Sequence, residues 1–438
     1  MADSRGHALG AAMLGMLLDG YDLSIMAVVL LPLSSAWHLQ ATETGILMAM
    51  ALLGSLIGGL FGGFFTDRFG RRRLLFPNIF LYVLGALISA FSPDTAALFA
   101  GRFITGLAIG LDYPLVATIV AEYSQSAQRG NRFARVNLAW YVGALLSTLV
   151  GWALLSTGPD SWRWMLGSAI VPALDLIWLR RGLPESPRWL VRKGQHQQAE
   201  EALAQLQPAY SPAQRQAELE SFQIQRQSWR ILLRKAWLRR LFLSVFPWFC
   251  LDVVGLGIGL YFPMVLRDNG LASSNAAAAA INAAFLIISA LGIVFIVSRL
   301  DRWGRIPLQS AGFALMSLGL AVFALCSWNH WIMGVYLAAA VYSFGVGIGP
   351  GVTVFALAVE IFPTELRASA AGLATALSRL GAFFSAVLFP IFEKSWGIPL
   401  VLVFMSVVAL LGLLATLIYG VESRMKSLEE LENLAAKN

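Results

Sequence analysis

Long apolar stretches follow one another along most of this chain, and short polar segments separate them. Each stretch of 18 or more predominantly apolar residues predicts a membrane-spanning helix, because about 20 apolar residues are needed to cross the hydrocarbon core of a bilayer. Six such stretches lie on each side of a long polar segment at residues 181–239. The predicted spans are 9–33, 43–66, 74–92, 96–123, 134–157, 162–180, 240–266, 275–298, 306–327, 331–360, 368–391 and 396–420. We therefore expect an all-α membrane protein of twelve transmembrane helices.

The composition agrees with this pattern. Of the 438 residues, 58% are hydrophobic and 13% are charged, and the mean hydropathy is +0.68. The first apolar stretch runs for about 25 residues without a small-residue cleavage site after it, so we expect a retained helix and not a secretory signal peptide. The high share of hydrophobic residues and the low share of charged residues exclude an ordinary soluble protein.

The positions of the basic residues predict the orientation. The net charge of +7 would suggest a nucleic-acid partner in a soluble protein, but here the Lys and Arg residues flank apolar spans. If the N-terminus is cytoplasmic, 27 of the 32 Lys and Arg residues lie on the cytoplasmic side, three lie outside and two fall within spans. Cytoplasmic loops of membrane proteins are enriched in Lys and Arg. We expect both termini in the cytoplasm and no nucleic-acid partner.

The polar segment at 181–239 reads as a cytoplasmic linker. Ala202, Leu203 and Leu206 recur at helical spacing, which predicts short amphipathic helices on the cytoplasmic face. The segment has one His, no Cys and no glycine-rich phosphate loop, so a catalytic domain is not expected there. The predicted organisation is an N-terminal bundle at 1–180, the linker at 181–239, a C-terminal bundle at 240–420 and a cytoplasmic tail at 421–438.

Polar motifs of the first half return in the second half. The offsets between the matching motifs are 234, 238 and 237 residues. The matching pairs are Asp67–Arg71 (DRFGR) with Asp301–Arg305 (DRWGR), Glu122 and Arg129 with Glu360 and Arg367, and Pro184–Ser186 with Val421–Ser423. Three matches at nearly one offset indicate a duplicated six-helix unit. Parallel repeats of this kind are typical of transporters in which two halves rock about a central site.

At these motifs the chain resembles the major facilitator superfamily over nearly its whole length. "GFFTDRFGRR", Gly63 to Arg72, is similar to the signature of the loop between helices 2 and 3 in that superfamily. "PESPRWL", from Pro184, is similar to a signature shared by the sugar porters, the phosphate:proton symporters and their organic-ion relatives. The resemblance implies two six-helix bundles with pseudo-symmetry and transport by alternating access.

Finer resemblances point to three subfamilies. "GLDYPLVATIVAEY", from Gly110, and "WFCLD", Trp248 to Asp252, resemble the helix 4 and helix 7 patterns of the phosphate:proton symporters. That likeness implicates Asp112, Tyr113, Trp248 and Asp252 in substrate or proton contacts, although Leu256 stands where that family carries Tyr. "LDGYDLSIM" is similar to helix 1 of the aromatic-acid:proton symporters, and "GYD" with an arginine in helix 4 resembles the proton-coupled sugar porters. The sequence does not decide which of the three subfamilies this chain matches in its ligand.

Acidic residues inside predicted spans are candidates for function, because a carboxylate in hydrocarbon is costly. Five fall there: Asp19, Asp22, Asp112, Asp175 and Asp252. No histidine lies well inside a span, so a carboxylate must carry the protons if protons drive transport. Asp19 and Asp22 are three residues apart and share a helical face. Burial and mutual repulsion both favour the protonated form of such a pair.

Arg102 in the fourth span is the predicted partner of Asp22. Their depths in the membrane differ by about 7 Å at about 1.5 Å per residue, which an arginine side chain can bridge. Protonation of Asp22 would release Arg102 and break a contact specific to one access state. We assign proton coupling to Asp22 and Arg102 with Asp19 and Asp112. The alternatives are a static packing pair, a structural Asp112 and an Asp19 that reaches the cytoplasmic surface.

Aromatic, amide and charged side chains of the spans are the candidates for substrate contact. The predicted substrate-binding residues are Tyr21, Tyr113, Asn137, Tyr141, Trp248, Asp252, Asn282 and Arg379. Arg379 is the one strong cation in the second half's predicted membrane core. It would suit an anionic substrate or a pair with Asp252, and the sequence leaves both possibilities open.

The repeated cytoplasmic motifs are predicted to form a latch that stabilises the outward-open state and does not contact the ligand. Its residues are Gly63, Asp67, Arg68, Gly70, Arg71, Glu122, Arg129, Asp301, Arg302, Gly304, Arg305, Glu360 and Arg367. The glycines permit close backbone approach, and the acids can meet helix ends and arginines of the facing half. For the basic run Arg71 to Arg73, control of topology alone is the alternative.

Together these patterns predict a secondary active transporter, a proton-coupled symporter of a small polar metabolite such as an organic or inorganic anion or a sugar. An uncoupled facilitator and a transporter-like sensor are the alternatives, and a membrane enzyme is disfavoured because no nucleophile with a base and no metal-ligand cluster appears. The expected partners are the solute, protons and the lipid bilayer. We expect no cofactor, a monomer, and a location in the cell membrane, the inner membrane of a bacterium.

Overall fold

The computed structural model describes residues 4–123, 129–222, 235–362 and 364–424, and within these ranges helices are the only regular secondary structure. The all-α prediction is confirmed. The helices of the first half are α1 (Ser4–Trp37), α2 (Ala41–Phe69), α3 (Arg71–Ala90), α4 (Thr95–Tyr123), α5 (Arg129–Leu154), α6 (Ser161–Gly167) and α7 (Ile170–Arg180), with one 3₁₀ turn, Leu155–Thr157, after α5.

The second half repeats this order. Its helices are α11 (Lys235–Asp268), α12 (Asn275–Val297), α13 (Leu300–Trp303), α14 (Arg305–Trp328), α15 (Ile332–Ile348), α16 (Pro350–Glu360), α17 (Thr364–Trp396) and α18 (Ile398–Tyr419). Within the described residues, 11 helical segments are long and apolar enough to cross a membrane. The predicted sixth span, 162–180, is missing from that number because it is broken at Ser168 and Ala169 into α6 and α7.

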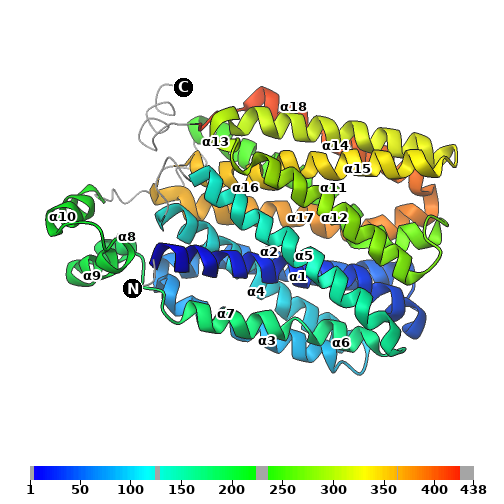
Figure 1. Cartoon of the computed structure of the whole chain (residues 1–438), viewed down its shortest axis with the longest axis horizontal. Helices are drawn as coiled ribbons and strands as arrows, with labels where there is room; N and C mark the ends of the chain where they lie inside the picture. The colour runs from blue at the N-terminus through cyan, green and yellow to red at the C-terminus, as the bar shows by residue number, and fades with distance from the viewer. Residues whose placement is uncertain (1–3, 124–128, 223–234, 363, 425–438) are drawn as a thin grey trace.

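Three short helices form the linker at one end of the molecule, where α1 begins and α18 ends (Figure 1). They are α8 (Pro187–Arg192), α9 (His196–Leu206) and α10 (Pro212–Ser221). Their apolar faces pack on one another, with Ala202 and Leu203 of α9 buried. We call this end of the molecule the linker end. That it faces the cytoplasm remains the prediction from the basic residues.

Small residues allow the helices within each half to approach closely. Backbone atoms of Ala51 in α2 face Gly106 of α4, and those of Ser55 face Gly110 one turn further along. The four-residue spacing places both glycines on one face of α4. The two halves meet along three helix pairs, α2 with α17, α5 with α12 and α1 with α11.

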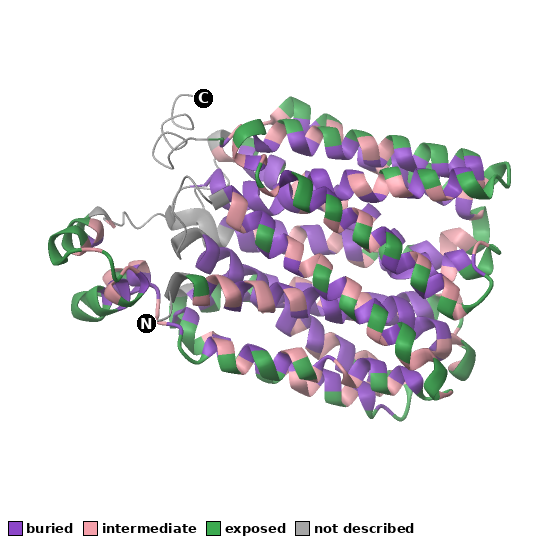
Figure 2. Ribbon diagram, in the orientation of Figure 1, coloured by how far each residue is buried: buried purple, intermediate pink, exposed green. Residues whose placement is uncertain are grey.

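The outer surface of the bundle is apolar. Figure 2 shows exposed positions on the outward faces of the helices and buried positions between them. Large exposed side chains include Phe80, Trp178, Leu325 and Leu417. In a soluble protein so much exposed apolar surface would be unusual, but lipid is the expected neighbour of these side chains.

Candidate functional site

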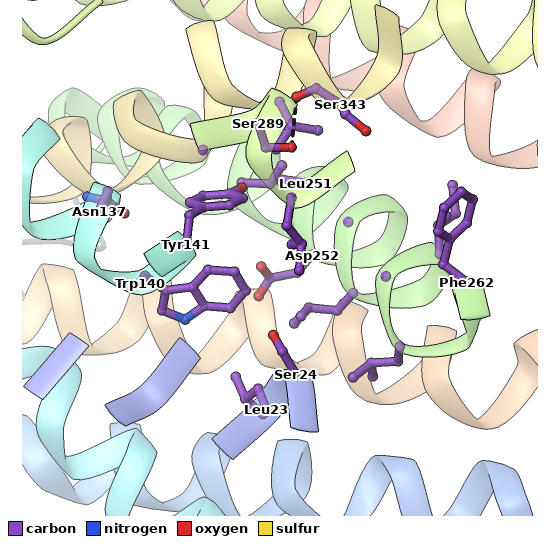
Figure 3. A pocket seen from close by; sticks show the side chains of 18 of the residues that line it. Leu23, Ser24, Asn137, Trp140, Tyr141, Leu251, Asp252, Phe262, Ser289 and Ser343 are labelled. Atoms are coloured by element: carbon purple, nitrogen blue, oxygen red, sulfur yellow. Dashed lines mark hydrogen bonds between the residues drawn. The ribbon is translucent and has the colours of Figure 1, made fainter. Parts of the chain in front are cut away.

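A cavity of about 170 Å³ lies between the two halves. Helices α1, α4 and α5 line it from the first half, and α11, α12, α15, α16 and α17 line it from the second. Figure 3 shows side chains such as Ser24, Trp140 and Asp252 around this space, from α1, α5 and α11. We call it the central cavity. Because both halves contribute to its wall, a relative movement of the halves changes access to it.

Seven of the eight residues predicted to contact substrate line the central cavity: Tyr113, Asn137, Tyr141, Trp248, Asp252, Asn282 and Arg379. The eighth, Tyr21, is buried inside the first half, where its hydroxyl oxygen lies 2.7 Å from Oγ of Ser168. The cavity-lining positions of α1 are instead Leu23, Ser24 and Ala27. The sequence pattern identifies α1 as a lining helix, but it does not separate the cavity face from the bundle face.

Aromatic rings from both halves meet in the wall of the cavity. The ring centroid of Tyr113 in α4 lies 6.3 Å from that of Trp248 in α11 and 6.2 Å from that of Phe355 in α16. Trp248 and Phe355 are 5.9 Å apart and nearly perpendicular. Phe355 and the apolar residues Leu251 and Phe262 also line the cavity but were not predicted. An apolar side chain in an apolar helix carries no signal that separates lining from packing.

Asp252 and Arg379 form an ion pair in the cavity wall. Nη1 of Arg379 lies 2.8 Å from Oδ2 of Asp252. The guanidinium carbon of Arg379 also lies 4.7 Å from the ring centroid of Tyr113, within the range of a cation–π interaction. The sequence left open whether Arg379 faces the cavity or pairs with Asp252, and the structure has both arrangements at once.

Asp22 and Arg102 pair inside the first half. Nη1 of Arg102 lies 3.1 Å from Oδ1 of Asp22, and Nη2 donates to the backbone carbonyl of Asp22 at 3.0 Å. Both residues are 2% exposed, and they do not line the described cavity. Asp22 lies about 200° around α1 from the lining residue Ser24, at about 100° per residue. The predicted partners are therefore paired, on the side of α1 away from Ser24.

The two other predicted coupling acids lie in the same bundle interior. Oδ1 of Asp112 accepts hydrogen bonds from Nη2 of Arg180 at 2.5 Å and from Nδ2 of Asn78 at 2.6 Å. Asp19 accepts one from the hydroxyl of Tyr82. Arg180 was not predicted as a site residue, because it is the last residue of the predicted sixth span. Its position at a helix end gave no sign that it points inward.

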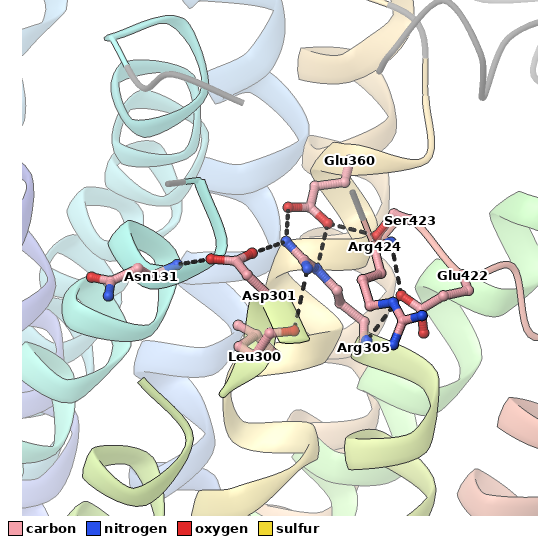
Figure 4. A network of polar contacts seen from close by, with 8 residues as sticks. All are labelled: Asn131, Leu300, Asp301, Arg305, Glu360, Glu422, Ser423 and Arg424. Carbon is pink, nitrogen blue, oxygen red and sulfur yellow. Dashed lines mark hydrogen bonds and ion pairs between the residues drawn. The ribbon is translucent and has the colours of Figure 1, made fainter. Parts of the chain in front are cut away.

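The repeated motif of the second half forms a polar network around the buried residues Arg305 and Glu360 (Figure 4). Arg305 donates from Nε and Nη2 to the two carboxylate oxygens of Glu360, at 2.9 and 2.8 Å. Nη2 of Arg305 also lies 3.0 Å from Asp301, whose other oxygen accepts the backbone N–H of Asn131 at 3.3 Å. Asn131 lies in the first turn of α5, in the other half, so the network crosses between the halves. Asp301 thus meets the start of a helix of the other half, where a carboxylate is favourable.

Two glutamates that were not predicted as latch residues hold the turns of the repeated motif. Gly70 and Gly304 have φ of +91° and +93°, a conformation that favours glycine. The carboxylate of Glu185 accepts the first backbone N–H groups of α3, and the carboxylate of Glu422 accepts those of α14 at 3.0 Å. Both glutamates belong to the third repeated motif. The repeat was visible in the sequence, but nothing there showed that two motifs meet in space.

The other predicted latch residues are placed as follows. Gly63 and Arg71 are buried. Arg68 is exposed, and its guanidinium lies over the rings of Phe64 and Phe69. Arg302 is exposed, and its backbone carbonyl accepts a hydrogen bond from Arg424. The side chains of Asp67, Glu122, Arg129 and Arg367 lie outside the described part of the structure. Among the described residues, no group of His, Cys, Asp or Glu is arranged to hold a metal ion.

Comparison with known proteins identifies the family. The model of the "Sugar (and other) transporter" family matches residues 7–435. The Escherichia coli K12 protein YaaU, a putative metabolite transport protein, is 32% identical over 97% of this chain and 93% of its own length. The arabinose-proton symporter of Bacillus subtilis 168 is 27% identical over 99% of this chain and 97% of its own length.

Solved structures show the same fold. The proton:xylose symporter XylE of the major facilitator superfamily, with 6-bromo-6-deoxy-D-glucose bound, superimposes with a TM-score of 0.87 at 24% identity, over 98% of each chain. These relatives are transporters, and the chain is accordingly a multi-pass membrane transporter and not an enzyme. With a family model that matches nearly its full length, this chain belongs to the sugar (and other) transporter family.

Proposed function

We propose that this protein is a proton-coupled symporter that brings a small polar solute into the cell by alternating access of the central cavity. The observation that carries the proposal is the buried ion pair of Asp22 with Arg102, at 3.1 Å. Oδ2 of Asp22 and Nε of Arg102 have no hydrogen-bond partner among the described residues, so the pair is not fully satisfied. A proton on Asp22 removes the attraction that holds Arg102, at a place where water cannot replace it.

The position of Asp22 links this event to the cavity. Its neighbours Leu23 and Ser24 line the cavity, and α1 packs against α11 of the second half. Arg102 also holds the backbone carbonyl of Asp22, so release of Arg102 frees a main-chain acceptor in α1. Protonation thus acts on a helix that belongs both to the cavity wall and to the interface between the halves.

Relatives that are named as proton symporters support proton coupling and a small polar solute. They include the arabinose-proton symporter of Bacillus subtilis and the galactose-proton symporter of Escherichia coli, at 27% and 26% identity. YgcS of Escherichia coli, 29% identical, is named an inner membrane metabolite transport protein. We propose the bacterial inner membrane as the location of this chain as well.

Uptake by proteoliposomes tests the proposal. With an inward proton gradient, the purified protein should accumulate a small polar solute from a panel of D-xylose, L-arabinose, D-glucose, phosphate and benzoate. Asp22→Asn should reduce gradient-driven uptake at least about tenfold. The variant loses the proton site, and a free energy of coupling between proton and solute of about 1.4 kcal/mol corresponds to a factor of about ten. Counterflow, which needs no net proton movement, should persist in Asp22→Asn.

Asp160→Asn is the matched control, since Asp160 is an exposed acid whose side chain is 75% accessible. It should transport like the wild type. Uptake that ignores the proton gradient, or normal net uptake by Asp22→Asn, would instead identify an uncoupled facilitator.

A further inference from the structure

The central cavity contains one pair of opposite charges in a wall that is otherwise uncharged. Among the described lining residues, Asp252 and Arg379 are the two with a formal charge at neutral pH. Arg379 is 2% exposed and Asp252 is 5% exposed. Two ions so deeply buried are costly, and a pair that served only packing could be replaced by apolar side chains without loss of stability. Its place in the wall of the cavity therefore suggests a role toward the ligand.

The ion pair leaves one donor of Arg379 without a partner in the described structure. Asp252 already interacts with Arg379, and Ser378 and Trp248 are hydrogen-bond neighbours of the same carboxylate. Two buried polar atoms of lining residues have no partner in the described structure, Nε of Arg379 and Nε1 of Trp140. Both atoms are N–H donors. Unsatisfied buried donors favour a ligand that brings acceptor oxygens, above all an anion.

Some of the neutral polar side chains of the wall are engaged with protein. Nδ2 of Asn137 donates to the carbonyl of Phe133 at 3.0 Å, and Oγ of Ser289 donates to the carbonyl of Ser343 at 3.0 Å. Much of the remaining wall is aromatic or aliphatic. A monosaccharide carries hydroxyl groups on every side, and each one that it buries without a partner costs about 1–3 kcal/mol. The wall suits a ligand that is polar at one end and apolar along its body.

On the transport function proposed above, we infer that the substrate is a small organic monocarboxylate, with its carboxylate held by Arg379 and its apolar body against the rings of Tyr113, Trp248 and Phe355. Arg379 is suited to this because a guanidinium binds a carboxylate through two parallel hydrogen bonds. The cation–π contact with Tyr113 holds the guanidinium in place from the first half. A substrate bound there touches both halves at once, as alternating access requires.

Charge balance then involves Asp252. If the substrate carboxylate takes its place beside Arg379, two buried anions face one cation unless one of the anions is neutral. A proton on Asp252 restores a neutral site. The titratable and charged groups that face or influence this carboxylate are Arg379 from α17, Tyr113 from α4, Tyr141 from α5 and, through Arg379, Asp19 from α1. Binding of one anion is thereby linked to uptake of one proton at Asp252.

Binding to the purified protein in detergent tests this inference without any transport step. Titration with benzoate should change the tryptophan fluorescence, since Trp140 and Trp248 line the cavity. Benzamide, which has the shape of benzoate without its charge, and D-xylose should bind at least about tenfold more weakly. The affinity for benzoate should fall as the pH rises, by up to about tenfold per pH unit for one linked proton.

Variants at the pair separate their roles. Arg379→Gln should lose benzoate binding at least about tenfold, and Arg379→Lys should retain part of it because the charge remains. Asp252→Asn should bind benzoate with an affinity that no longer depends on pH. Arg299→Gln is the control, because Arg299 lies between α12 and α13 and outside the cavity, with its guanidinium hydrogen-bonded to the carbonyl of Phe295. Thermal melting of each variant, measured alongside, confirms that it is folded.

The inference is overturned if benzoate and aliphatic monocarboxylates such as hexanoate do not bind, if D-xylose or an amino acid binds more tightly, or if Arg379→Gln binds benzoate as the wild type does. Proton-driven uptake of a neutral sugar without benzoate binding would remove this inference and leave the proposed symport intact. Benzoate binding combined with uptake that does not respond to the proton gradient would remove the proposed symport and leave this inference intact.

Discussion

Gly304 has a backbone conformation that most residues avoid, and it lies directly before α14. Its φ is +93°, and a Cβ atom on it would lie 2.6 Å from Oε2 of Glu422. That carboxylate accepts the backbone N–H groups of Arg305 and Ile306, the first two residues of α14. Gly70 and Glu185 repeat the arrangement in the first half. The glycine is therefore required both for its φ and for the space that the glutamate fills.

Gly304→Ala should lower the thermal stability of the detergent-solubilised protein, with an expected cost of about 1–3 kcal/mol. The reason is that alanine adds both backbone strain and displacement of the Glu422 carboxylate. Gly270→Ala is the control, because Gly270 also has positive φ, +70°, but no described atom lies within 4 Å of its added Cβ. Melting followed by tryptophan fluorescence should rank the control nearer the wild type. Equal losses in both variants would show that Glu422 does not matter.

At the residue scale, the sequence predicts the ion-pair partner of a buried charge well only when the spans contain few residues of the opposite charge. Asp22 and Arg102 are opposite charges within apolar spans, so their pairing could be inferred from depth alone. The partner of Asp112 is Arg180, which sits at a helix end and looked like an ordinary boundary arginine. Tyr21 was predicted to contact substrate, but its hydroxyl forms a hydrogen bond with Ser168. The sequence could not show this, because α1 is buried on its cavity face and on its bundle face, and the two faces have the same pattern of residues.

Close packing of α2 on α4 determines how the first half is built. A Cβ added at Gly106 would lie 2.7 and 2.8 Å from backbone atoms of Ala51, and one added at Gly110 would meet the backbone at Ser55 and Gly59. Backbone atoms cannot move aside as a flexible side chain can, so the two helices would have to separate. The closeness of this pair also positions Arg102, which lies one turn before Gly106 in α4.

Gly106→Ala should therefore destabilise the protein by about 1–3 kcal/mol, the usual cost of overpacking a tight interior. Gly10→Ala in α1 is the matched control, since no described atom lies within 4 Å of its added Cβ. The control should melt at the wild-type temperature or slightly above, because alanine favours a helix by about 0.5–1 kcal/mol over glycine. If Gly106→Ala melts with the control, α2 and α4 are not packed as described.

At the element scale, hydropathy predicts where spans lie but not where they break. The sixth span divides at Ser168 and Ala169, and the tenth divides at Gly349, between α15 and α16. The second break was readable in principle, because Gly349 precedes Pro350, which has no N–H to give to the helix before it. An average over 18 apolar residues hides both breaks, since backbone geometry does not enter it.

The two halves of the molecule are held together at the linker end by a polar and an apolar contact. Asp301 of the second half accepts the backbone N–H of Asn131 in α5 of the first half. Beside it, Ala134 of α5 is fully buried against Ile296 of α12 and Val352 of α16. Separation of the halves at this end would break both contacts and open the central cavity toward the linker end.

Removal of the Asp301 carboxylate should therefore favour the state that is open at the linker end. A hydrogen bond from a partly exposed carboxylate to a helix N-terminus is worth about 1 kcal/mol, which corresponds to a shift of about fivefold in the equilibrium. In a background with Cys250→Ser and Cys326→Ser, the thiol introduced by Ala134→Cys reports this opening through its rate of maleimide labelling. Asp301→Ala should raise that rate several-fold.

Asp94→Asn is the control for that experiment, because Asp94 lies at the other end of the bundle, where it caps the start of α4. Its labelling rate should match that of the background. An unchanged rate in Asp301→Ala would mean that apolar packing between the halves, including that of Ala134, is enough to keep them closed, and that the polar network stabilises only the second half. The raised rate of Asp301→Ala could also fall again when a transported solute is added. A ligand lowers the rate only if it binds the state closed at the linker end more tightly than the open state. That result would link the polar network of Asp301 to occupation of the central cavity, as alternating access requires.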